Sequence, residues 1–196
     1  MDFIRLYFKH HISNIMPDDS KSWDLLSSEI LFEHPFIKLS EDRVVLPSGK
    51  ESTWLCLDFG GDGACVILEN SEGKILLGRQ YCHPPRALVF EFPGGGVGKN
   101  ETPEAAARRE AIEEVGVYPK NLTNIGYFLF NNRRSSAKLY VFVGKDLELR
   151  EAAPEEHEQV EIAWYSVEEI DEMIRLGQIV NVNLLGAWAL YKSRKY

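Results

Sequence analysis

Three glutamates on one predicted helix face are the part of this sequence best suited to chemistry. Glu110, Glu113 and Glu114 are three and four positions apart or adjacent, and residues at such intervals share one side of an α-helix. Carboxylates held this close repel one another, and as a set of oxygen ligands they favour a hard divalent cation, Mg2+ above all. A solvated acidic helix face has the same composition. The neighbouring residues decide between these two interpretations.

The helix has clear start and stop signals, and glycines precede it. Thr102 is a good N-cap and Pro103 suits the first helical position, while Gly116 is a typical residue just beyond a helix end. The run Pro93-Gly94-Gly95-Gly96 comes shortly before. Because glycine permits conformations closed to other residues, this loop lets the backbone approach a ligand or a metal closely. A glycine loop that leads into an acidic helix favours a metal site.

Taken together, these spacings resemble the Nudix box. The residues that match its defined positions are Gly95, Glu101, Arg109-Glu110-Ala111, Glu113-Glu114 and Gly116-Val117. A weaker likeness extends from about Trp23 to the C-terminal helix. There the segments Arg79-Gln80-Tyr81 and Glu91-Phe92-Pro93-Gly94-Gly95 are similar to the ADP-ribose and nucleoside-diphosphate-sugar pyrophosphatase branch.

The resemblance implies roles for individual residues. It assigns the metal to the Gly94 carbonyl and to the carboxylates of Glu110 and Glu114, with Glu113 sharing or orienting. It implies that Arg109 pairs with Glu101 and supports the catalytic glutamates. Gly95 and Gly96 are expected to contact the substrate.

The proton acceptor is a separate question. In the resembled branch a glutamate from a loop after the central strands often serves, and Glu156 and Glu158 lie at about that place, in a run that also contains Glu155. The alternative is that this charged run is a solvated loop.

Three arginines are candidate substrate contacts. Arg79 ends a predicted strand before the glycine loop and would hold the diphosphate or nucleoside, or else form an edge-strand salt bridge. Arg133 and Arg134 would clamp a phosphate, or else belong to an ordinary solvated turn. They stand where many ADP-ribose hydrolases carry a Ser-Pro-Gly loop, so the substrate stays open.

Composition limits the function further. The 196 residues are 44% hydrophobic and carry a net charge of −8, with no basic stripe to follow a nucleic-acid backbone. The three cysteines, Cys56, Cys65 and Cys82, form no C-x-x-C pair, which favours a reducing cytoplasm. The charged N-terminus is too short for a membrane span. We therefore expect a cytoplasmic protein that binds neither nucleic acid nor membranes.

The chain is expected to have an α/β fold in three parts. We assign residues 1–22 to a leader or helix, 23–60 to a small antiparallel sheet and 61–196 to a Nudix catalytic domain, an α/β/α sandwich with a mixed sheet. Strands are predicted at 29–38, 42–46 and 51–59, with a turn at 47–50, and a hairpin turn at 69–73 between strands at 64–68 and 74–80. Helical patterns cover 167–176 and 184–191.

The expected activity is Mg2+-dependent hydrolysis, with Mn2+ as a possible substitute. The substrate would be ADP-ribose or a nucleotide sugar, giving a nucleoside monophosphate and a sugar phosphate. The alternatives are a house-cleaning nucleoside triphosphate pyrophosphohydrolase and a non-hydrolytic nucleotide sensor. A homodimer is expected from the resembled branch, in which the N-terminal sheet joins the dimer.

Overall fold

The computed structural model describes residues 21–153 and 160–194. The described residues form two compact units, which divide between Leu57 and Asp58. Nearly all of the segment expected to be a leader, residues 1–22, lies outside the described residues. Among those described, no helix is both long enough and apolar enough to cross a membrane.

The first unit is an antiparallel sheet of β1 (Asp24–His34), β2 (Ile37–Val45) and β3 (Glu51–Asp58), in that order. The turn predicted at 47–50 is confirmed, because the Leu46 amide donates to the Lys50 carbonyl at 2.9 Å. The strand predicted at 29–38 is wrong as a single strand. It contains the end of β1, a tight turn at Pro35 and Phe36, and the start of β2.

Strand β1 carries large apolar side chains that stay exposed within the chain. They include Leu25 (61% exposed), Ile30 (54%) and Phe32 (54%). A sheet normally buries one face against another layer. Among its described residues, 21–57, this unit therefore presents apolar surface without a covering layer.

The second unit combines two sheets with three helices. Its described elements, in chain order, are β4 (Gly63–Leu68), β5 (Ile75–Cys82), β6 (Ala87–Glu91), β7 (Gly94–Gly96), α2 (Pro103–Val115), β8 (Val117–Leu129), β9 (Lys138–Leu149), β10 (Glu161–Tyr165), α3 (Val167–Arg175) and α4 (Val182–Ser193). One sheet has the order β7-β4-β9-β8 and the other β10-β5-β6. The first is mixed, since β4 and β9 run parallel while their outer neighbours are antiparallel.

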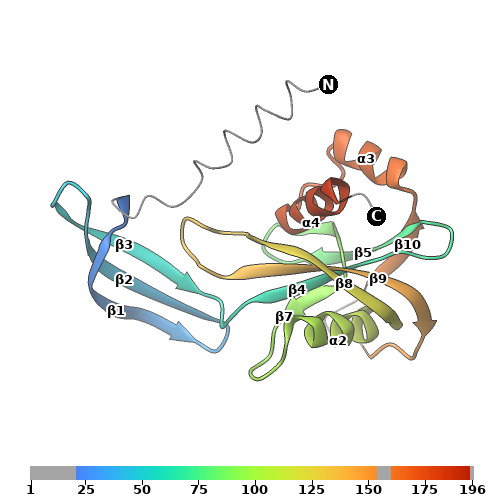
Figure 1. Ribbon diagram of the computed structural model, residues 1–196, viewed down its shortest axis with the longest axis horizontal. Coiled ribbons are helices and arrows are strands. Elements are labelled where there is room, and N and C mark those ends of the chain that lie inside the picture. Colours follow the sequence, from blue (N-terminus) through green and yellow to red (C-terminus); the bar gives the residue numbers. More distant parts are fainter. Residues whose placement is uncertain (1–20, 154–159, 195–196) are drawn as a thin grey trace, which may run out of the picture. The chain divides into compact units, whose positions relative to one another are not determined.

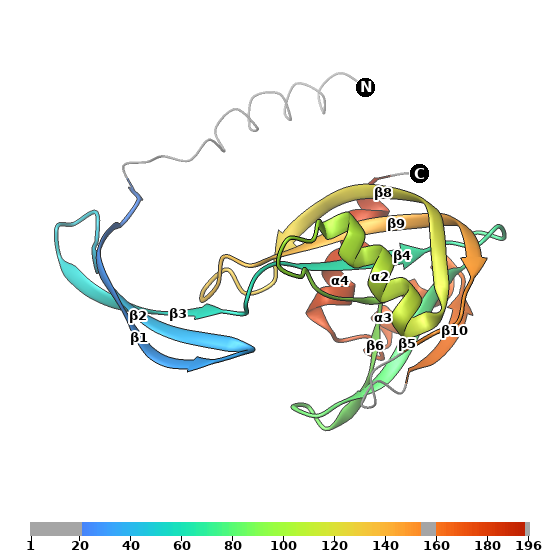
Figure 2. The same cartoon turned by 90° about the horizontal axis from the view of Figure 1, so that it is seen from below.

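The second unit is layered, with helices on both sides of its strands. Figure 1 shows α2 on one side and α3 and α4 on the other, and Figure 2 shows α2 lying across the strands that it packs against. The side chains of β4 alternate accordingly. Ala64, Val66 and Leu68 join a core that includes the alanines of α2, whereas Cys65 and Ile67 join a core on the α4 side. The predicted α/β/α sandwich is confirmed.

Two strands were missed and one predicted hairpin is corrected. The turn at 69–73 forms, with the Asn70 side chain accepting from the Glu72 and Lys74 amides at 2.9 Å. However, β4 and β5 belong to different sheets and share only an isolated bridge between Glu69 and Ile75. Strands β7 and β10 were not predicted, because a glycine triplet and a short exposed segment lack a strand pattern.

Candidate active site

Helix α2 begins and ends as its sequence predicts. The Thr102 side chain accepts from the Ala105 amide at 3.1 Å, and Pro103 opens the helix. Gly116 ends it in the left-handed conformation (φ 64°), which costs glycine little. A Cβ at Gly116 would lie 2.7 Å from the Arg150 carbonyl oxygen, so this end of α2 is packed tightly against the segment after β9.

The buried side of α2 is made of small residues. Ala106, Ala107 and Ala111 have no exposed surface, and they let the helix lie close to the sheet. Glu110 is on the same helix and is buried too, at 9% exposure. A carboxylate at this depth needs charged or polar partners.

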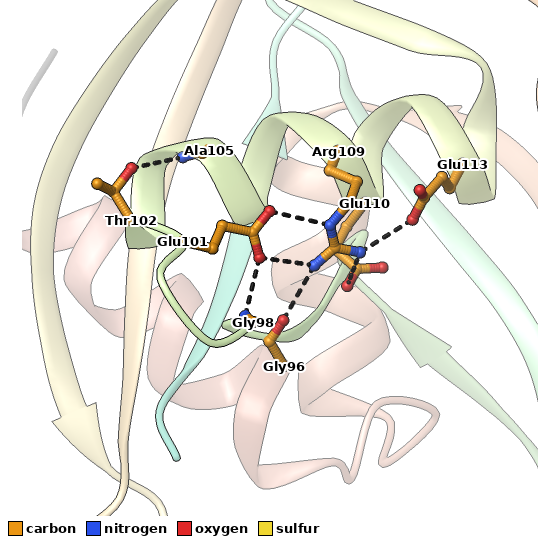
Figure 3. A network of polar contacts seen from close by, with 8 residues as sticks. All are labelled: Gly96, Gly98, Glu101, Thr102, Ala105, Arg109, Glu110 and Glu113. Atoms are coloured by element: carbon orange, nitrogen blue, oxygen red, sulfur yellow. Dashed lines mark hydrogen bonds and ion pairs between the residues drawn. The ribbon is translucent and has the colours of Figure 1, made fainter. Parts of the chain in front are cut away.

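Arg109 provides the positive charge at the centre of the acidic cluster (Figure 3). Its Nε and Nη2 donate to the two oxygens of Glu101 at 3.0 and 3.1 Å. Its Nη1 donates to Glu110 at 2.8 Å and to Glu113 at 2.9 Å, and Nη2 also donates to the Gly96 carbonyl at 3.0 Å. One planar guanidinium thereby holds three carboxylates and the glycine strand, which a point charge cannot do.

The pKa values follow from these contacts. Hydrogen bonds from the Arg109 side chain, and then from the Gly98 amide, hold the pKa of Glu101 below its usual value. The hydrogen bond to Glu101 is the largest of the contacts that raise the pKa of Arg109. The Arg109–Glu101 pair is therefore ionised throughout the physiological range.

Strand β7 brings the glycines against the helix carboxylates. Its register on β4 pairs Cys65 with Gly94 and Ala64 with Gly95. The Gly94 amide donates to Glu114 Oε2 at 3.1 Å. A Cβ on Gly95 would lie 2.4 Å from Glu110 Oε1, so the carboxylate occupies the space that any side chain at Gly95 would take.

These groups line a cavity of about 310 Å³. We call it the carboxylate cavity, and its lining residues are Gly94, Gly95, Gly96, Arg109, Glu110, Glu113, Glu114 and Ala153. Carboxylate and carbonyl oxygens are the ligands that hard divalent cations prefer. The donor set therefore fits such a cation.

Arg109 holds the Glu110 and Glu113 carboxylates in their present positions. Within residues 21–153 and 160–194, no three His, Cys, Asp or Glu side chains are already arranged to hold a metal ion. Because Arg109 Nη1 contacts both Glu110 and Glu113, a cation would have to draw these carboxylates away from the guanidinium.

A second cavity, of about 270 Å³, shares part of its wall with the first. Gly94, Gly95, Gly96 and Glu114 line both. Its other lining residues include Gln80 of β5, Glu91 of β6, and Asn181, Asn183 and Leu184 at the start of α4. We call it the α4 cavity.

A polar network that sequence reasoning missed lies in the wall of the α4 cavity. Gln80 Nε2 donates to Glu91 Oε2 at 2.9 Å, and Asn181 Nδ2 donates to Glu91 Oε1 at 2.8 Å. Asn181 also caps α4, since its Oδ1 accepts from the Asn183 amide at 2.7 Å. The available signal was the asparagine before the final apolar helix, which is an N-cap pattern. Its contact with Glu91, 90 positions away, had no local signal.

Arg79 precedes Gln80 of this network in the chain. Strand β5, which carries it, is the central strand of its sheet, so the alternative of an edge-strand salt bridge is wrong. Its guanidinium carbon lies 5.5 Å from the centre of the Phe90 ring, and its buried Nε has no hydrogen-bond partner in the part of the chain that the structure describes. The residue does not line either cavity.

The remaining predicted residues lie elsewhere. Arg133 and Arg134 are exposed in the turn after β8 and do not line the two cavities. Glu155, Glu156 and Glu158 lie outside the described residues. The chain that leads to them is attached to α2, because the Ala153 amide donates to the Glu113 carbonyl at 3.1 Å.

Known proteins resemble this chain over most of its length. The NUDIX domain model matches residues 61–182, and the model of the nucleoside diphosphate sugar hydrolase N-terminal domain matches residues 23–54. The chain is 30% identical to an ADP-ribose pyrophosphatase of Bacillus subtilis over 156 residues, which cover 79% of this chain and 84% of that protein. It is also 28% identical to a methanol dehydrogenase activator of Bacillus methanolicus, over 76% of this chain and 82% of the relative.

The fold has a counterpart among solved structures. The crystal structure of an ADP compounds hydrolase superposes with a TM-score of 0.77 at 17% identity, covering 88% of this chain and 93% of that one. At this identity the likeness concerns the fold.

Proposed function

This chain belongs to the Nudix family of hydrolases, and from that premise we propose that it hydrolyses the diphosphate bond of a nucleoside diphosphate linked to a second moiety, with Mg2+ as its cofactor. ADP-ribose and nucleotide sugars are the first candidates, and the products would be a nucleoside monophosphate and a sugar phosphate. The ADP-ribose pyrophosphatase relative supports this choice of substrate class.

The observation that carries the proposal is the position of Glu114 between two cavities. Its carboxylate accepts from the Gly94 amide at 3.1 Å, and the residue lines both the carboxylate cavity and the α4 cavity. A diphosphate that bridges two groups requires a charged site for its phosphates next to a separate site for one of those groups. The two adjoining cavities supply that division.

The metal would be held by Glu110, Glu113 and Glu114, with the Gly94 carbonyl as a backbone ligand. When bound, Mg2+ neutralises phosphate charge and lowers the pKa of a water molecule. Mn2+ is expected to substitute, because it accepts the same oxygen ligands.

Arg109 has a positioning role in this proposal. It keeps Glu110 and Glu113 beside the glycine strand through Nη1. Its bidentate pairing with Glu101 fixes the guanidinium even after the other carboxylates have turned towards a cation. The site is therefore held in shape in both conditions.

We propose Glu156 or Glu158 as the proton acceptor. Support comes from the attachment of Ala153 to the Glu113 carbonyl, which starts this loop beside the acidic helix. Replacing each with Gln separately tests the assignment. Replacing the proton acceptor is expected to lower kcat with little change in KM. Replacing the other glutamate is expected to leave kcat unchanged.

We further propose that the chain forms a homodimer through its N-terminal sheet, with 23–60 and 61–196 as separate domains. The exposed apolar side chains of β1 support this, since a sheet with unburied Leu25, Ile30 and Phe32 gains stability by covering them. Light scattering at micromolar concentration tests it, and a particle of only 22.4 kDa would contradict it.

A turnover screen tests the activity. ADP-ribose, nucleotide sugars, dinucleotides and nucleoside triphosphates would be incubated with Mg2+ or Mn2+ and their products identified. Cleavage between two phosphates of a sugar diphosphate supports the proposal. Release of pyrophosphate from a triphosphate would favour the house-cleaning enzyme, and tight binding without turnover would favour a nucleotide sensor.

Two variants on α2 sharpen this test. Glu114→Gln is expected to reduce kcat by about 100-fold or more, because a metal ligand contributes several kcal/mol of transition-state stabilisation. Glu104→Gln is the matched control on the exposed face, where the Glu104 carboxylate pairs with Arg108 at 2.7 Å. Near-normal activity of Glu114→Gln would contradict the assigned role.

A further inference from the structure

The α4 cavity is acidic, although it adjoins the site that we propose for phosphate cleavage. Its lining includes the carboxylates of Asp62, Glu91 and Glu114. Among the described residues that line it, none is a lysine, arginine or histidine. A phosphate in this cavity would meet like charges, which cost several kcal/mol when they are brought together out of water.

Two side-chain amides of the cavity are held by Glu91. The Gln80 and Asn181 NH2 groups donate to the two oxygens of Glu91. The Asn181 oxygen accepts from the start of α4. Glu91 keeps acceptor capacity for a ligand, since each carboxylate oxygen accepts more than one hydrogen bond. A ligand that donates hydrogen bonds, such as a sugar hydroxyl, therefore suits this wall.

Backbone amides hold Asp62, one of the three carboxylate residues of this wall. Asp62 Oδ1 accepts from the Lys138 amide at 2.8 Å, and its carbonyl accepts from the Val97 amide at 2.9 Å. Asp62 thereby connects the start of β9 with the residue after β7. The acidic wall is part of the fold, and phosphate could not displace it at low cost.

The other walls are apolar. Phe59 and Phe130 lie with ring centroids 5.5 Å apart, and Phe92 and Leu139 are buried at the cavity. Apolar walls combined with acceptor groups suit a neutral sugar, whose ring carbons contact the aromatic faces while its hydroxyls donate to carboxylates.

From these features we infer that the α4 cavity binds the uncharged hydroxyls of a ribose or hexose in the substrate and rejects the same sugar once it carries a phosphate. The inference rests on the proposed function for the placement of the diphosphate at the carboxylate cavity. It adds a selection rule, namely that Glu91 and Asp62 exclude substrates by charge.

Kinetics with two phosphorylated substrates test the rule and identify which sugar enters. The probes are ADP-ribose, ADP-ribose with a phosphate on the terminal ribose, and ADP-ribose with a 2′-phosphate on the adenosine ribose, all with Mg2+. We expect kcat/KM to fall by about 100-fold for the probe whose phosphate enters the cavity. Values within threefold of ADP-ribose for both phosphorylated probes would overturn the inference.

Charge-removing variants show whether the acidic wall is responsible. Glu91→Gln and, separately, Asp62→Asn keep the shape of each side chain, and each is expected to narrow the discrimination by about tenfold. Glu172→Gln, on the exposed face of α3 in an ion pair with Arg175, is the control and should leave the ratio unchanged. If neither variant changes the ratio, the inference is wrong.

Binding without turnover separates this inference from the proposed function. Methyl β-D-ribofuranoside and ribose 5-phosphate would be titrated into the metal-free protein while the side-chain amide NMR signals of Gln80 and Asn181 are followed. We expect the riboside alone to shift them. A shift in a protein that hydrolyses none of the substrates would sink the proposed function and keep the inference, whereas hydrolysis without any shift would do the reverse.

Discussion

Helix α2 and strand β1 handle their surfaces in opposite ways. On α2 the apolar side chains Ala106 and Ala107 are fully buried, and the charges around Arg109 are paired within the unit. On β1 every residue is exposed, including large apolar ones such as Ile30 and Phe32. Among the described residues, the apolar side chains of the first region are covered and those of the second are not. This difference separates the region in which we propose the chemistry from the region that we propose for assembly.

Among the changes that test this comparison, the largest loss of turnover is expected from filling the space between β7 and α2. Gly95→Ala places a Cβ 2.4 Å from Glu110 Oε1, so the carboxylate must move. Turnover should fall by about 100-fold, since small displacements of catalytic groups have effects of that size. Gly96→Ala is the comparison, because its Cβ meets nothing within 4 Å, and it should lose much less. Equal losses would show that Glu110 does not need its present position.

The next effect concerns β1. Replacing Ile30 and Phe32 together with Asp is expected to weaken dimerisation by about tenfold or more, because charges would be buried in the proposed interface. Stability of the isolated chain should change little. Sedimentation velocity over a range of concentrations measures the association, with the double replacement of Ser27 and Ser28 by Asp as a control of equal charge. Unchanged association in the first variant would remove β1 from the interface.

A smaller effect is expected from Arg109→Lys. An ammonium cannot reproduce the contacts with Glu101, Glu110, Glu113 and the Gly96 carbonyl. We expect a loss of about 1 kcal/mol in unfolding free energy, discounted because the guanidinium is partly exposed. Urea denaturation measures it. Full stability in the variant would mean that the network does not hold α2 against β7.

The smallest effect is expected in the pH dependence of the unfolding free energy. The pKa of Glu101 is lowered in the folded protein from its ordinary value of 4.5, chiefly by the Arg109 hydrogen bond. This stabilisation is therefore present above pH 4.5 and is lost as the pH falls through the lowered pKa. Glu101→Gln should be less stable than the parent at about pH 7, and the difference should shrink towards about pH 3. Urea denaturation at both pH values measures the difference in unfolding free energy between the parent and the variant. A difference that does not change with pH would exclude the Arg109–Glu101 ion pair as its source.

Local chemistry explains what the sequence could predict. The ends of α2 are set by Thr102, Pro103 and Gly116, which act on the backbone next to them. The arrangement of Glu110, Glu113 and Glu114 follows from helical periodicity, and the turn at 69–73 from Asn70 and Gly73. These features depend on residues a few positions apart, so the local sequence is enough to predict them.

What escaped prediction depends on distant contacts. Strand β7 is formed of glycines and exists because Cys65 and Ala64 of β4 pair with it. The separation of β4 and β5 into two sheets is decided by their partners β9 and β6. The contact between Glu91 and Asn181 joins strand and helix ends across the fold. No periodicity or capping rule identifies such pairs.

The lack of side chains on β7 has an electrostatic consequence. Gly94, Gly95 and Gly96 line both the carboxylate cavity and the α4 cavity, and they contribute backbone but no side chain to the wall that the cavities share. Unit charges about 4 Å apart interact by about 4 kcal/mol at the effective permittivity of a protein surface. A divalent cation bound in the carboxylate cavity therefore changes the electrostatic potential at a ligand in the α4 cavity. The affinity of the protein for the cation and its affinity for the ligand are then thermodynamically linked.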